Sequence, residues 1–92
     1  MAVSLNQLPG ADLIDAGVRD LAAGAETVAA LLVSIGAPRL RQLGIVVESS
    51  IADPEHRLYL LLAADEPDSA HGRYNALIRR LVSFERAAAC VD

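Results

Sequence analysis

The chain has 92 residues, 53% of them hydrophobic, and a formal net charge of -4. This length excludes a second sizeable core, so residues 1–92 are expected to form a single helical domain. Only 3% of the residues are aromatic, and a core of Leu, Ala, Val and Ile favours close helix packing over a sandwich. We therefore predict an all-α fold, a small orthogonal or up-down bundle of four to five helices with a long last helix.

The first half of the chain contains two predicted helices and a short turn. Pro9 and Gly10 precede an apolar stripe at helical spacing that ends at Gly24. The second helix is expected to begin near Glu26 or Thr27 and to be the buried centre, because it has almost no polar face. We expect Gly36 to end this helix. A short helical turn from Pro38 through Leu43, closed by Gly44, is then predicted.

The second half contains a connector and two more predicted helices. Residues 45–47 are β-branched and are expected to be an extended connector over the core, since no second strand is available to pair with them. Asp53 and Pro54 indicate a helix start in which Asp caps, and this helix is expected to run through Ala64. After residues 65–68, a final helix of ~22 residues is predicted, roughly 33 Å long. Its far end is expected to extend past the bundle.

Basic residues of this final segment lie on one helical face. At 100° per residue, the four arginines of this face gather opposite an apolar side; they are Arg73, Arg79, Arg80 and Arg86. The rest of the chain is acidic: residues 1–68 hold four Arg against ten acids, giving -6, whereas residues 69–92 hold four Arg against two acids, giving +2. The arginine face is therefore a candidate for binding an anion or an acidic partner, although an ordinary solvated face has the same pattern.

Glu85 interrupts the apolar side of the final segment. Its helical position places it among Leu81, Ile78 and Ala88, where a carboxylate is costly unless it is paired or solvated. Three interpretations remain open. The carboxylate is solvated beyond the bundle, it is paired with an arginine such as Arg57 or Arg41, or it contacts a partner.

Motifs for catalysis, cofactors and metals are not present in the sequence. His56 and His71 are fifteen residues apart and form no ligand spacing with Cys90, the single cysteine. There is no Gly-rich phosphate loop and no nucleophile elbow. We therefore expect no catalytic residue, no cofactor and no metal. A helix-turn-helix over residues 27–45 is disfavoured, because its second segment is too short for a recognition helix.

The apolar segments suggest association. The expected core includes Leu31, Leu32, Ile35, Leu61 and Leu81. Helices with hardly any polar face are difficult for so small a domain to cover completely. We therefore predict a non-catalytic helical protein-protein interaction or regulatory module, homodimeric or bound to a helical partner, with interface candidates Tyr59, Leu60 and Leu62.

Two alternatives accompany this prediction. The first is a nucleic-acid-associated regulator that uses the arginine face, and the second is an enzyme built around His71 and Glu85. The N-terminal sequence lacks the pattern of a signal peptide, and the longest apolar run, from Leu58 to Ala64, is too short for a membrane span. No membrane association is expected, and a cytoplasmic location is predicted.

Overall fold

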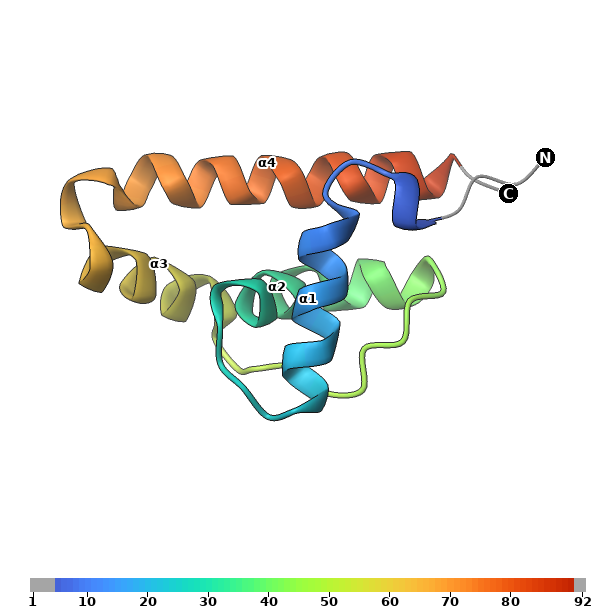
Figure 1. Ribbon diagram of the computed structural model, residues 1–92, viewed down its shortest axis with the longest axis horizontal. Helices are drawn as coiled ribbons and strands as arrows, with labels where there is room; N and C mark the ends of the chain where they lie inside the picture. Colours follow the sequence, from blue (N-terminus) through green and yellow to red (C-terminus); the bar gives the residue numbers. More distant parts are fainter. Residues whose placement is uncertain (1–4, 91–92) are drawn as a thin grey trace.

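The computed structural model describes residues 5–90, which form four α-helices and no strand. The helices are α1 (Ala11–Ala22), α2 (Val28–Gln42), α3 (Pro54–Asp65) and α4 (Ala70–Ala89), with short 3-10 turns η1 (Leu5–Gln7) and η2 (Pro67–Ser69). In Figure 1, α4 runs along one long side, α2 and α3 lie below it, and α1 crosses in front of α2. The all-α fold with a long last helix is confirmed.

The crossing of α1 over α2 is close because Gly17 has no side chain. A Cβ at Gly17 would collide with the carbonyl oxygen of Ala29 and with Cγ2 of Val33, both on α2. Gly17 is buried, and Val33 is 0% exposed. The small residue therefore lets the two helix backbones approach each other, which brings Ile14 and Leu21 onto the core.

Helix α2 is the buried centre, as predicted, but it is longer than expected. It begins after Thr27, whose Oγ1 accepts a hydrogen bond from the amide of Ala30 at 3.1 Å. The prediction that Gly36 ends this helix is wrong, since α2 continues through both Gly36 and Pro38 to Gln42. Pro38 is exposed within the helix. The helix-turn-helix over residues 27–45 is also excluded, because no turn separates two helices there.

Packing explains why Gly36 lies inside α2. A Cβ at this position would be 2.8 Å from Cδ1 of Leu81 and 3.1 Å from Oε2 of Glu85. Gly36 thus lies at a close contact between α2 and α4, and this tertiary contact overrides the weak helix propensity of glycine.

The connector from α2 to α3 has no regular secondary structure, and it covers only part of the core. Val47 is 6% exposed, whereas Val46 is 70% exposed. Two hydrogen bonds that involve side chains attach the connector to α2: the Nε of Arg41 donates to the carbonyl of Val47, and the amide of Ile51 donates to Oγ of Ser34. The connector therefore follows α2 without forming a strand.

Helix α3 begins at the predicted residue, but the expected cap is absent. Asp53 precedes Pro54, yet its side chain forms no capping hydrogen bond, because its backbone is left-handed with φ of 51°. Arg57 instead ties the start of α3 to the residues before α2. Its guanidinium forms two hydrogen bonds with the carboxylate of Glu26, at 2.6 and 3.1 Å.

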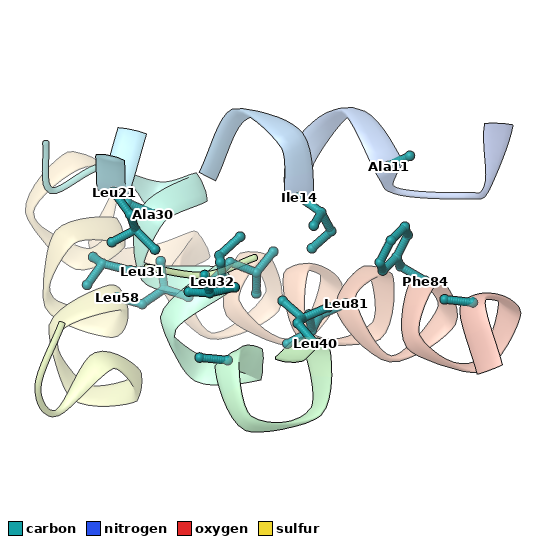
Figure 2. Packing of buried hydrophobic residues seen from close by; sticks show 14 of the residues in the cluster. Ala11, Ile14, Leu21, Ala30, Leu31, Leu32, Leu40, Leu58, Leu81 and Phe84 are labelled. Atoms are coloured by element: carbon teal, nitrogen blue, oxygen red, sulfur yellow. The ribbon is translucent and has the colours of Figure 1, made fainter. Parts of the chain in front are cut away.

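The core lies between α2 and the other three helices (Figure 2). Of the predicted core residues, Leu31, Leu32 and Leu81 are buried and Ile35 is partly buried. Leu61 was expected in the core and is 39% exposed, so that prediction is wrong. Ala88, in the last turn of α4, is 6% exposed. The end of α4 is therefore covered at Ala88. The prediction that it extends past the bundle is wrong.

Candidate interaction surfaces

The predicted arginine face of α4 consists of two arginines that form ion pairs and two that form none within residues 5–90. Arg73 donates to Oδ2 of Asp65 at 2.9 Å, and Arg80 lies 3.5 Å from Oδ1 of Asp12. Arg79 and Arg86 are exposed, and neither forms an ion pair with any residue between 5 and 90. The face is therefore partly used in holding α4 to α1 and to the end of α3.

A hollow lies where the start of α1 meets the arginine face. It has a volume of about 280 Å³ and is lined by Pro9, Gly10, Ala76, Arg79, Arg80 and Ser83. Two of the four predicted arginines thus line one concave surface, whereas Arg73 and Arg86 do not.

Glu85 is partly buried against Gly36 of α2. Burial raises the pKa of its carboxyl, and the positive charge of Arg39 lowers that pKa less strongly. Of the three interpretations left open for Glu85, pairing with Arg57 or Arg41 is not found, since Arg57 binds Glu26 and Arg41 donates to a backbone carbonyl. Glu85 is therefore a partly desolvated carboxylate that forms no ion pair within residues 5–90.

The outer face of α3, which we define as Tyr59, Leu60 and Leu61, is the most exposed group of large apolar side chains on one helix. Leu60 is 54% exposed, and Tyr59 and Leu61 are each 39% exposed. Leu62, predicted as an interface residue, is 1% exposed and belongs to the core. That prediction is corrected, because Leu62 lies about 40° from Leu58 around the helix and the two point inward together.

A second hollow, which is lined mainly by apolar side chains, lies between α1 and the connector. It has a volume of about 250 Å³, and its walls include Ile14, Val18, Val46 and Phe84. Neither this hollow nor the outward position of Leu61 was expected from the sequence. Both depend on contacts between elements that are distant in the chain.

The geometry does not assemble an active site around His71 and Glu85. Both residues lie on α4, fourteen residues apart, which corresponds to about 21 Å along a helix. His71 is exposed, and its Nε2 is 3.2 Å from Nδ2 of Asn75. Within residues 5–90, no group of His, Cys, Asp and Glu side chains is arranged to hold a metal ion.

Comparisons with protein-family models, curated protein sequences and solved structures found no match to this chain. Within residues 5–90, no helix combines the length and the apolar character that crossing a membrane requires.

Proposed function

We propose that this protein is a non-catalytic helical protein-protein interaction module that forms a homodimer through the outer face of α3. The observation that carries the proposal is the exposure of Tyr59, Leu60 and Leu61, at 39%, 54% and 39% respectively. A single exposed leucine is ordinary on a protein surface. Three adjacent large apolar residues on one short helix are typical of a surface that another chain covers.

The position of Leu60 on α3 makes it the centre of this face. At 100° per residue, Leu60 lies about 180° from the midpoint of Leu58 and Leu62, the two core residues of the helix. Tyr59 and Leu61 flank Leu60 on either side. A partner helix that packs along α3 would therefore centre on Leu60 and meet Tyr59 and Leu61 at the two edges of the contact, since each lies about 100° from Leu60.

The tyrosine at the edge of the face is already held in place. The ring centroids of Tyr59 and Tyr74 are 6.0 Å apart, with the ring planes inclined at 59°. This tilted geometry is favourable for aromatic pairs. Because Tyr74 anchors the ring, Tyr59 loses less conformational entropy when a partner binds.

A second copy of the chain is the partner that needs the fewest additional features. An isologous dimer uses the same surface on both subunits, so one apolar face is sufficient for the whole interface. Burial of an exposed leucine stabilises by up to about 1.5–3 kcal/mol, and each such contact occurs twice in an isologous dimer.

The alternative of a nucleic-acid-associated regulator has weaker support. Two of the four arginines are engaged in ion pairs, with Asp65 and Asp12, and the helix-turn-helix is absent. The alternative of an enzyme around His71 and Glu85 is disfavoured by their separation along α4.

Replacement of Leu60 by Glu tests the proposed dimer. Wild-type protein is expected to have twice the 9.7 kDa mass of one chain by light scattering, and Leu60→Glu is expected to be a folded monomer, because a charge is costly in an apolar interface. Ala22→Glu is the matched control, since Ala22 is also exposed on a helix and gains the same charge. Wild-type protein that stays monomeric at its highest soluble concentration would exclude the dimer.

A further inference from the structure

We propose that the hollow between the start of α1 and the middle of α4 binds the phosphate group of a small phosphomonoester. Its walls come from two segments that are far apart in the sequence: Pro9 and Gly10 on one side, and the α4 residues Ala76, Arg79, Arg80 and Ser83 on the other. This site is independent of the outer face of α3, because no residue is common to the two surfaces.

The polar residues of α4 that line the hollow share one side of the helix. At 100° per residue, Arg79, Arg80 and Ser83 all lie within about 100° of one another around the helix. The two guanidinium groups offer several N–H donors in a planar arrangement that suits phosphate oxygens, and the hydroxyl of Ser83 adds another donor. Three donor side chains thus line one concave surface, where they can reach the oxygens of a bound anion.

The two arginines are available to a ligand to different degrees. Arg79 is exposed and forms no ion pair within the described part of the chain. Arg80 lies 3.5 Å from the carboxylate of Asp12, and the side chains of this pair are 50% and 85% exposed. An exposed pair at this distance contributes little to stability. A phosphate group can therefore displace Asp12 from Arg80 at low cost.

Gly10 holds the opposite wall in place. Its backbone is left-handed, with φ of 80°, and a Cβ there would be 3.2 Å from the backbone oxygen of Arg80. Because the wall is backbone packed against backbone, the hollow is formed before any ligand binds. Such preorganisation lowers the entropic cost of binding.

The chemistry of the hollow favours a monoester over a diester. A phosphomonoester carries a charge of about -1.5 to -2 at neutral pH, which two guanidinium groups match better than the single charge of a diester. The volume of about 280 Å³ also leaves space for a small substituent against Pro9 and Ala76. Phosphate groups also occur in the backbone of nucleic acid, where every phosphate is a diester. A small phosphomonoester and a nucleic-acid backbone can therefore be distinguished by comparing a monoester probe with a diester probe.

The test uses the full chain and two probes at constant ionic strength, phenyl phosphate and dimethyl phosphate. Amide NMR shifts of Gly10, Ala76 and Ser83 are expected to saturate with phenyl phosphate. Arg79→Gln should weaken this binding about tenfold, because it removes a charge-assisted hydrogen bond. Arg86→Gln is the matched control: it changes the net charge equally and lies on the same helix, but Arg86 does not line the hollow.

Asp12→Asn provides a variant whose effect has the opposite sign. Removal of the competing carboxylate should strengthen phenyl phosphate binding by roughly 1.4- to 5-fold, the range expected for an exposed ion pair. Non-saturating shifts, or equal weakening by Arg79→Gln and Arg86→Gln, would show only diffuse attraction and would overturn the proposal. Dimethyl phosphate binding as tightly as phenyl phosphate would assign the hollow to backbone phosphates and would overturn the monoester assignment.

Discussion

Replacement of Gly17 by Ala probes the contact between α1 and α2. The substitution adds one methyl group to a buried position in the middle of α1. The new Cβ would lie 2.8 Å from the carbonyl carbon of Ala29 and would also overlap with Cγ2 of Val33. Since the first of these atoms belongs to the backbone of α2, a change of side-chain rotamer cannot relieve the collision, and the two helices must separate.

Two opposing terms set the size of the effect. Alanine stabilises a helix by about 0.8–1.0 kcal/mol relative to glycine. Overpacking of a core costs about 1–3 kcal/mol and occasionally more, and the backbone contact at Gly17 places this substitution at or above the upper end of that range. The expected net loss is about 2 kcal/mol. For a domain of this size, that loss corresponds to a decrease in melting temperature of about 8–16 °C.

Gly72→Ala is the matched control for Gly17→Ala. Gly72 is also in a helix, but a Cβ there would meet no atom within 4 Å. The same chemical change should therefore stabilise the protein by about 0.4–1 kcal/mol. Thermal and urea unfolding of both variants would measure the difference. Equal stabilisation by the two substitutions would refute the close crossing of α1 and α2.

Two further predictions concern α3 and Glu85. Leu62→Ala is expected to lower the free energy of unfolding by about 2–5 kcal/mol, and Leu61→Ala by less than about 1 kcal/mol in dilute solution; the reverse order in urea denaturation would mean that α3 is rotated. Burial raises the pKa of Glu85, so its contribution to stability is present at acid pH and is lost as the pH rises through its folded pKa. Glu85→Gln should therefore be more stable than wild type at pH 7 and should lose this advantage below about pH 4; a less stable variant at pH 7 would indicate that the carboxylate is paired.

Helix starts were predicted well because their signals are local. Thr27 caps α2 through a hydrogen bond to the amide of Ala30, three residues later. The fixed φ of Pro54 suits the first turn of α3. Neither signal requires knowledge of any other helix. The capping role predicted for Asp53 failed because its left-handed backbone is a property of the incoming connector.

Predictions that depend on contacts between helices were less accurate. Gly36 has the local chemistry of a helix end, but its lack of a side chain is used for the approach of Leu81 on α4. Helix α3 is apolar around most of its circumference, so its hydrophobic pattern does not define which side faces the core. This ambiguity explains why Leu61 and Leu62 were assigned to the wrong sides.

The arginine face of α4 shows which properties of a surface helical spacing can predict and which it cannot. Helical spacing places the four arginines on one side of α4, but it cannot distinguish an arginine that is held by a carboxylate from one that is free. That distinction depends on where Asp12 and Asp65 lie in the folded chain, next to Arg80 and Arg73 respectively. The hollow beside Arg79 likewise exists only because Gly10 packs against α4 from the other end of the sequence. Substitutions at Arg79 and Asp12 therefore test a property of the folded chain, which a charge pattern alone does not determine.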